Sequence, residues 1–215
     1  MNSDFLTKVF ELLNKNQELP YYQAERRIDI FVNLFLEDIV HQKTKFVDAK
    51  FITVEFPLKK MPEDYKDNNR KEDDNSAQID YLMVDVIKRT VLLIELKTDD
   101  NSFDSKQIKF YLKHQTFEDW YDKFKRIKMI NFKEKRDKLH QRIIEENMGK
   151  DFINFSVEVI VLKPTYNETK DRKGLEKDKE RIHFVALKSL DIVSKDYPNE
   201  WKLFKENVLE KLPSK

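Results

Sequence analysis

Residues 78–111 read QIDYLMVDVIKRTVLLIELKTDDNSFDSKQIKFY, and the rest of the chain is organised around this stretch. It holds two runs rich in β-branched and aliphatic residues, IDYLMVDV and TVLLIEL, with Lys88 and Arg89 between them. Runs of this length and composition predict two β-strands. The short polar break between them predicts a hairpin, and a polar connection then leads into a helix.

A loop of even length centred on the Lys-Arg pair sets the expected register of the hairpin. Leu82 then faces Glu95, and Asp80 faces Lys97. Directly opposed residues, and residues two apart, share one face of a sheet. One face is therefore apolar except at one end, where Asp80, Glu95 and Lys97 gather. The apolar residues of this face are Leu82, Val84, Val86, Val91 and Leu93, and those of the other face are Ile79, Tyr81, Met83, Leu92, Ile94 and Leu96. Two apolar faces predict a hairpin covered on both sides.

The charges at the end of this face need a physical reason, because burying a lone carboxylate costs several kcal/mol. The expected diagonal from Asp80 to Glu95 is roughly 5–8 Å between Cβ atoms, which leaves room for a cation. Hard divalent ions such as Mg²⁺ take oxygen ligands, usually one or two carboxylates with water and substrate phosphate. Lys97 would then hold a phosphate or the attacking water. The alternative is a structural salt bridge between Asp80 and Lys97, with Glu95 at a solvated strand end.

The helix after the hairpin is expected to extend to about Lys128, with Asp104 or Ser105 as its N-cap. Three of its side chains fall at i, i+4 and i+7 and so share one face: Gln107, Tyr111 and His114. This face begins a few residues after the charged strand end. We therefore expect it to lie over the same site.

In chain order, Asp80, Glu95-Leu96-Lys97 and Gln107-x-x-x-Tyr111 resemble the core of the PD-(D/E)XK nuclease superfamily. The Gln-x-x-x-Tyr element resembles that of RecB-type, exonuclease-like members. The resemblance implies a restriction-endonuclease-like α/β fold, a mixed β-sheet flanked by helices on both faces, and a nuclease that uses Mg²⁺ or Mn²⁺. It implies Asp80 and Glu95 as metal ligands and Lys97 as the residue that assists the attacking water. It also implies that Gln107 and Tyr111 support the catalytic site.

A helix expected from about Tyr21 to His41 adds two residues to this candidate site. In many of these nucleases a Glu on the helix before the sheet reaches the metal, which implies Glu25 as a third ligand. Otherwise Glu25 is a favourable charge at a helix N-terminus, worth under about 1 kcal/mol. Arg26 is expected to meet phosphates or to pair with surface acids. The chain departs from the family pattern at Ile79, where the name-giving Pro would stand, as many members do.

The net charge is only +1, but basic residues are unevenly distributed. The segment from Lys106 to Arg142 holds 12 Lys and Arg residues against 5 Asp and Glu, with aromatic residues between them. Lys and Arg displace the counterions of a phosphate backbone, so this surface suits nucleic acid, and DNA is the expected partner. The candidate contacts are Lys106, Lys109 and Lys113, with a salt-sensitive affinity that homodimerisation would raise. The alternative is a solvated helix face whose aromatics lie in the core.

Composition excludes several other classes of function. The two glycines exclude a Walker phosphate loop and a G-x-G-x-x-G dinucleotide turn, and the absence of cysteine excludes disulfides and thiolate metal sites. The four histidines are dispersed, form no H-E-x-x-H pattern and are expected to be ordinary surface or interface residues, and no Ser-centred nucleophile motif is present. No apolar run approaches a membrane span and the N-terminus lacks a signal-peptide pattern, so we expect a cytoplasmic protein without membrane contact.

The length suits a single nuclease-like domain over residues 1–215, with an exposed charged loop at 59–76. Further expected elements are helices at 2–15 and 133–147, strands at 49–58, 152–162 and 181–187, a charged loop at 164–180, and a helical segment at 190–211 broken at Pro198. This order predicts a mixed sheet with helices on both faces. The rival to a nuclease is a non-catalytic nucleic-acid or protein binding module on the same fold. A third possibility is a partner domain whose buried charges are simply paired.

Overall fold

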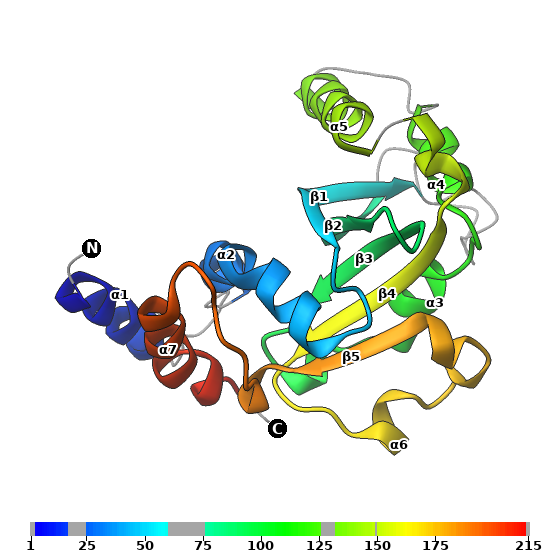
Figure 1. Ribbon diagram of the computed structural model, residues 1–215. Helices are drawn as coiled ribbons and strands as arrows, with labels where there is room; N and C mark the ends of the chain where they lie inside the picture. The colour runs from blue at the N-terminus through cyan, green and yellow to red at the C-terminus, as the bar shows by residue number, and fades with distance from the viewer. Residues whose placement is uncertain (1–2, 17–24, 60–75, 126–131, 149, 214–215) are drawn as a thin grey trace.

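The computed structural model describes residues 3–16, 25–59, 76–125, 132–148 and 150–213. Side chains at 3–5, 13–16, 25–27, 59, 76, 123–125, 132–137 and 150 are outside this description, as are residues 60–75 of the charged loop expected at 59–76. The described part holds a five-stranded sheet in the order β1-β2-β3-β4-β5 (Figure 1). Its strands are β1 (Lys50–Lys59), β2 (Ser76–Asp85), β3 (Thr90–Leu96), β4 (Ser156–Lys163) and β5 (Ile182–Ala186). The first three are antiparallel, and β3, β4 and β5 are parallel.

Helices pack on both faces of this sheet. The α-helices are α1 (Ser3–Asn16), α2 (Glu25–Lys43), α3 (Ser105–Tyr111), α4 (Phe117–Lys125), α5 (Phe132–Met148), α6 (Glu168–Asp171) and α7 (Pro198–Asn207). On one face Tyr81 and Leu92 pack with residues of α1, α2 and α7. On the other face Leu82 and Leu93 pack with residues of α3, α4 and α5. In Figure 1 these two groups of helices lie on opposite sides of the strands. The expected α/β class and mixed sheet are confirmed.

The register of the central hairpin differs from the expected one by two residues. Val84 pairs with Val91 and Asp85 with Thr90, so a four-residue turn replaces the two-residue loop. A Lys-Arg pair does not supply the two positive φ angles that a two-residue type I′ loop requires. In the observed turn only Arg89 has a positive φ, of 51°, and Oδ1 of Asp85 accepts a hydrogen bond from the backbone N–H of Lys88 at 2.8 Å.

The shift of two residues leaves most expected faces unchanged, because side chains alternate with a period of two. Val86 is an exception, since it lies in the turn and is exposed. Ile79 is the other, and it packs with the Leu82 face. Next to Ile79 the β1–β2 ladder passes over Glu55 and Asp80 without pairing them, and Glu55 has a φ of 50°. The prediction that placed Ile79 beside Tyr81 was therefore wrong.

The single helix expected from Asp104 to Lys128 is two helices. Helix α3 ends at Tyr111, and α4 begins at Phe117. The segment between them runs along the start of β4, where the backbone N–H of Val157 donates to the carbonyl of Gln115 and Thr116 bridges Ser156. These backbone hydrogen bonds to the start of β4 stabilise an extended segment there, and the helix does not continue past Tyr111.

Two further differences concern the last third of the chain. The charged segment at 164–180 contains α6 and a 3-10 helix at Glu176–Arg181. The C-terminal segment becomes α-helical only at Pro198, where a ring that lacks an N–H fits the first helical turn. No helix in the described ranges is long and apolar enough to cross a membrane.

Candidate functional site

Glu95 is the centre of the candidate site. It lies near the end of β3 and is only 3% exposed, yet its carboxylate accepts three hydrogen bonds. The Lys97 ammonium donates to Oε1 at 2.5 Å, and the amide Nε2 of Gln107 donates to the same oxygen at 2.8 Å. The hydroxyl of Tyr111 donates to Oε2 at 2.7 Å. Three donors on one carboxylate compensate the cost of burying its charge.

Asp80 meets this cluster from the neighbouring strand. Continuing the observed β2–β3 register by one pair beyond Tyr81–Ile94 places Asp80 opposite Glu95, where Lys97 was expected. Its Oδ2 accepts a hydrogen bond from the backbone N–H of Leu96 at 2.7 Å. Asp80 is half-buried, whereas Glu95 is buried. The Asp80 carboxylate is thus more accessible to solvent than the Glu95 carboxylate.

Lys97 is also buried, at 8% exposure, and it forms an ion pair with Glu95. The part of the expected alternative that placed Glu95 at a solvated strand end was wrong, because β4 and α3 cover that end of β3. The backbone N–H of Lys97 donates to the carbonyl of Leu162 on β4 at 2.7 Å. This bond extends the parallel ladder past the end of β3 and keeps Lys97 in line with the sheet.

Helix α3 is short but has a defined start. Oδ1 of Asp104 accepts a hydrogen bond from the backbone N–H of Lys106 at 2.8 Å, as the capping pattern predicts. Ile108 and Tyr111 bury one side of the helix against the sheet. Gln107, one turn before Tyr111, then bridges Glu95 and the Tyr111 hydroxyl, to which it donates at 2.5 Å. The sequence-predicted pair Gln107 and Tyr111 therefore meets the charged strand end.

His114, expected on the same face, is not part of this arrangement. It follows the end of α3, and its Nδ1 lies 3.1 Å from a carboxylate oxygen of Asp119. Its ring contacts Trp120 edge-on, with the centroids 4.7 Å apart. The early end of α3 removes the helical spacing on which the expectation depended.

Burial raises the pKa of the Tyr111 hydroxyl well above its usual value, and the nearby Glu95 charge raises it further. Tyr111 therefore remains a neutral hydrogen-bond donor across the physiological pH range. A neutral donor next to a buried carboxylate holds that carboxylate in place without removing its charge.

The structure describes only some of the side chains that are predicted to contact nucleic acid. Lys106, Lys109 and Lys113 are all exposed, on or just after α3. The side chains of Glu25 and Arg26, in the first turn of α2, lie outside the described residues. The aromatic residues between the basic ones that the structure describes, such as Phe117 and Trp120, are mostly buried in the core. They are not available for stacking on bases, which supports the core alternative for them.

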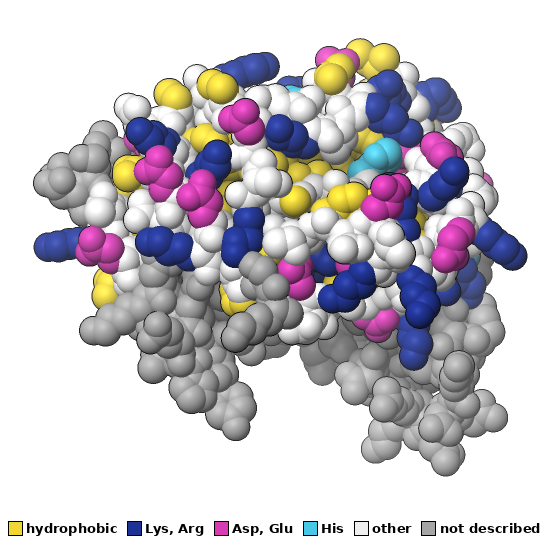
Figure 2. Space-filling view, turned by 90° about the horizontal axis from the view of Figure 1, so that it is seen from below, with side chains coloured by type: hydrophobic (Ala, Val, Ile, Leu, Met, Phe, Trp, Pro, Cys, Tyr) yellow, Lys and Arg dark blue, Asp and Glu magenta, His cyan; other side chains and the backbone are white. Residues whose placement is uncertain are grey.

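Charge on the rest of the described surface is mixed. On the face seen from below in Figure 2, Lys and Arg side chains are interspersed with Asp and Glu. Among the described residues of that face no patch of a single sign dominates, in agreement with the net charge of +1.

A second buried polar cluster beside the site was not foreseen. Lys163 is the last residue of β4, whereas Lys97 directly follows β3, and Lys163 is 2% exposed. Its ammonium lies 2.7 Å from Oδ1 of Asp171 and 3.6 Å from Oδ1 of Asp100. The sequence carried one signal for it, a Lys directly after the apolar run of β4. Its partners lie on segments expected to be plain loops.

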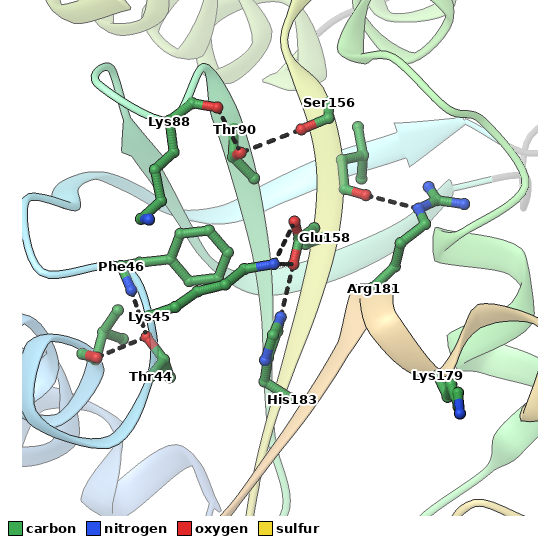
Figure 3. A network of polar contacts seen from close by, with 12 residues as sticks. Thr44, Lys45, Phe46, Lys88, Thr90, Ser156, Glu158, Lys179, Arg181 and His183 are labelled. Carbon is green, nitrogen blue, oxygen red and sulfur yellow. Dashed lines mark hydrogen bonds and ion pairs between the residues drawn. The ribbon is translucent and has the colours of Figure 1, made fainter.

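A third polar cluster lies on the opposite face of the sheet, toward the start of β4 (Figure 3). Oε2 of Glu158 accepts from Nε2 of His183 on β5 at 2.6 Å, and the Lys45 ammonium lies 3.0 Å from the same carboxylate. Burial by itself raises the Glu158 pKa, but hydrogen bonds from His183 and Lys45 outweigh it, so that the pKa lies below the usual value. This cluster shares no residue with the candidate site.

The donor chemistry of the site fits a hard divalent cation. Asp80 and Glu95 supply carboxylate oxygens from adjacent strands, which with water and phosphate form a usual Mg²⁺ ligand set. Among the described residues no three His, Cys, Asp or Glu side chains converge on one point. Asp80 and Glu95 are therefore the carboxylates that the described residues supply to a cation at this site, and the role of Glu25 as a third ligand stays a prediction.

Comparison of the chain with protein-family models, with curated proteins and with solved structures finds no match. The function proposed for this protein therefore depends on its own residues and their geometry.

Proposed function

We propose that this chain is a Mg²⁺-dependent nuclease that hydrolyses phosphodiester bonds, with DNA as its substrate, on a restriction-endonuclease-like sheet. The observation that carries the proposal is the convergence on Glu95. Its carboxylate binds Lys97, Gln107 and Tyr111, and Asp80 lies across from it on β2. These five residues come from β2, from β3 and the residue directly after it, and from α3, in the order that resembles the PD-(D/E)XK core.

In this proposal Asp80 and Glu95 hold Mg²⁺, and Mn²⁺ would serve as well. The bound ion would lower the pKa of a coordinated water and offset charge on the scissile phosphate. Because Asp80 is the more exposed carboxylate, substrate would approach from its side.

The remaining residues position the reacting groups. Lys97 offers an ammonium within the site, which steadies the attacking water or a phosphate oxygen. Gln107 and Tyr111 hold the Glu95 carboxylate in one orientation through their hydrogen bonds. The exposed Lys106, Lys109 and Lys113 would bind backbone phosphates next to the site.

A second candidate function is a non-catalytic nucleic-acid or protein binding module on the same fold. The close pairing of Lys97 with Glu95 favours it, because these two buried charges already neutralise one another. A module of this kind would bind DNA without metal and would not cleave it in Mg²⁺ or Mn²⁺.

The test is a cleavage assay on single-stranded DNA, duplex DNA and RNA, with Mg²⁺, Mn²⁺ or EDTA. Glu95→Gln and Lys97→Met should each lower the cleavage rate by about 100-fold or more. Glu158→Gln is the matched control, since it changes a partly buried, hydrogen-bonded acid on the opposite face, and it should change the rate less than about twofold. Calorimetric titration of Mg²⁺ into wild type and Asp80→Ala should show binding only in the wild type.

Full activity in folded Glu95→Gln would overturn the nuclease assignment. Metal-free DNA binding by a wild type that cleaves nothing would establish the binding module instead. Circular dichroism and thermal unfolding of every variant separate loss of chemistry from loss of fold.

A further inference from the structure

The Lys163 cluster consists of Lys163, Asp171, Asp100 and Thr165, and it lies one strand away from the candidate site. Leu96 pairs with Leu162 in the parallel β3–β4 ladder, so Lys97 and Lys163 are neighbours at the ends of these strands. Both ammonium groups are buried, and each has its own carboxylate partners. Two buried lysines side by side would repel one another strongly without these partners.

This cluster fastens the connection between β3 and α3. Asp100 begins a short 3-10 helix, Asp100–Ser102, in that connection. Its Oδ1 accepts from the backbone N–H of Thr165 at 3.2 Å, and its Oδ2 accepts from the Thr165 hydroxyl. The ammonium of Lys163 stands 3.6 Å from the same Oδ1. The connection is thereby tied to the segment that follows β4.

Phe103, in the same connection, makes the second attachment. The Lys163 ammonium lies 5.1 Å from the centre of the Phe103 ring, within the range of a cation–π contact. The Phe103 ring also packs edge-on against Phe184 of β5, with the centroids 5.7 Å apart. Polar contacts of Asp100 and aromatic contacts of Phe103 thus hold this short segment against the end of β4 and against β5.

Residues on either side of the connection donate hydrogen bonds to the same carboxylate oxygen. Lys97 precedes it and Gln107 follows it, and both donate to Oε1 of Glu95. A displacement of the connection would therefore change the distance from Gln107 to Glu95 directly. Misplacement of a catalytic group by about 1 Å can cost about 100-fold in rate.

We propose that Asp100 is a positioning residue for the nuclease site, held by Lys163 and Thr165 so that α3 presents Gln107 to Glu95. The inference depends on the proposed function for its effect on rate. Its structural part, the placement of Gln107, can be measured without any reaction. Lys163 itself is too deeply buried to reach a substrate, and its ion pair with Asp171 keeps it in place.

The test compares Asp100→Ala with Asp100→Asn and Thr165→Val. Asp100→Ala removes both acceptor oxygens, whereas Asp100→Asn keeps an acceptor for Thr165 and should restore most of the function. Thr165→Val removes only the hydroxyl donor at nearly constant shape, and it decides the question if Asp100→Ala does not fold. Glu158→Ala is the matched control, because it removes a hydrogen-bonded, partly buried acid from the opposite face.

The first readout is the side-chain NH2 signal of Gln107 in 1H–15N NMR spectra, assigned by its disappearance in Gln107→Glu. It should shift toward the position of a free amide in Asp100→Ala and Thr165→Val, and it should not shift in Glu158→Ala. The second readout is cleavage, in which kcat should fall about 10- to 100-fold in Asp100→Ala while KM changes less than about twofold.

The outcomes separate the two proposals. An unshifted Gln107 signal in folded Asp100→Ala or Thr165→Val overturns the positioning role, whatever the wild type cleaves. If the Gln107 signal shifts in these variants but the wild type never cleaves nucleic acid, the positioning role stands and the nuclease assignment is overturned. A shift of equal size in Glu158→Ala would show a general loosening of the fold and would also overturn the inference.

Discussion

The hydroxyl of Tyr111 on α3 donates a 2.7 Å hydrogen bond to Oε2 of Glu95 on β3, and both side chains are buried. The same hydroxyl accepts a hydrogen bond from the Gln107 amide. One phenol thus links a helix side chain to a strand carboxylate in the sheet interior. Loss of this hydroxyl would leave the Glu95 carboxylate and the Gln107 amide with fewer hydrogen-bond partners. We therefore expect a change at Tyr111 to affect both the stability of the protein and the geometry of the site.

Tyr111→Phe should lower the free energy of unfolding by about 1–3 kcal/mol, because the Glu95 carboxylate loses a donor that water cannot replace. Tyr121→Phe is the matched control. The Tyr121 hydroxyl donates to Glu145 at 2.8 Å, but Glu145 is exposed, so its loss should cost under about 1 kcal/mol. Urea unfolding at neutral pH measures both losses. Equal losses of unfolding free energy in the two variants would show that the Tyr111 hydrogen bond stabilises the protein no more than that of Tyr121.

Alkaline pH should destabilise the protein through Tyr111. Burial, and then the Glu95 charge, raise the Tyr111 pKa above its usual 10.0, so the native state keeps the proton that the unfolded chain releases. The stabilisation is present below about pH 10 and is lost as the pH rises further. Above about pH 10 the wild type should lose up to about 1.4 kcal/mol per pH unit more than Tyr111→Phe. Parallel slopes in the two proteins would contradict this prediction.

Acid pH should act on the opposite face through Glu158. Its pKa lies below the usual 4.5, because hydrogen bonds from His183 and Lys45 outweigh its burial. The stabilisation from ionised Glu158 is therefore present above about pH 4.5 and is lost as the pH falls. Glu158→Gln should be less stable than wild type at neutral pH and should lose less stability during acidification. Glu206→Gln, which changes an exposed acid 4.0 Å from Lys202, should follow the wild-type curve.

The three exposed lysines at α3 should set the salt dependence of DNA binding. Replacing Lys106, Lys109 and Lys113 together by Gln should reduce the slope of log K against log salt concentration by up to about 3, roughly 0.9 for each phosphate that is no longer neutralised. The effect should be the same for different DNA sequences, since binding to phosphates carries no sequence information. Fluorescence anisotropy in EDTA measures it without cleavage. Lys202→Gln with Lys205→Gln on α7 is the control, and an equal change there would show that the charge effect is not local.

Sequence patterns predicted which side chains come together around Glu95, apart from His114, because most of these placements follow from local spacing. Alternation places Asp80, Glu95 and Lys97 at one end of an apolar face, and the spacing of four places Gln107 and Tyr111 on one side of a helix. An error of two residues in the register left those faces unchanged. It altered the partner of Asp80, from Lys97 to Glu95, because pairing depends on turn geometry as well as on pattern.

Sequence patterns were enough to predict the mixed α/β class, the strands of the sheet and most of the residues that meet at Glu95, since these follow from periodicity and local preference. His114, which was predicted on the same helix face, lies outside this arrangement. Tertiary structure decided where α3 ends, because backbone bonds to the start of β4 take over after Tyr111. It also brought Asp100, from the connection between β3 and α3, to the Lys163 ammonium at the end of β4. Contacts of that kind form only when the packed sheet brings separate segments together and excludes water, and no local pattern encodes them.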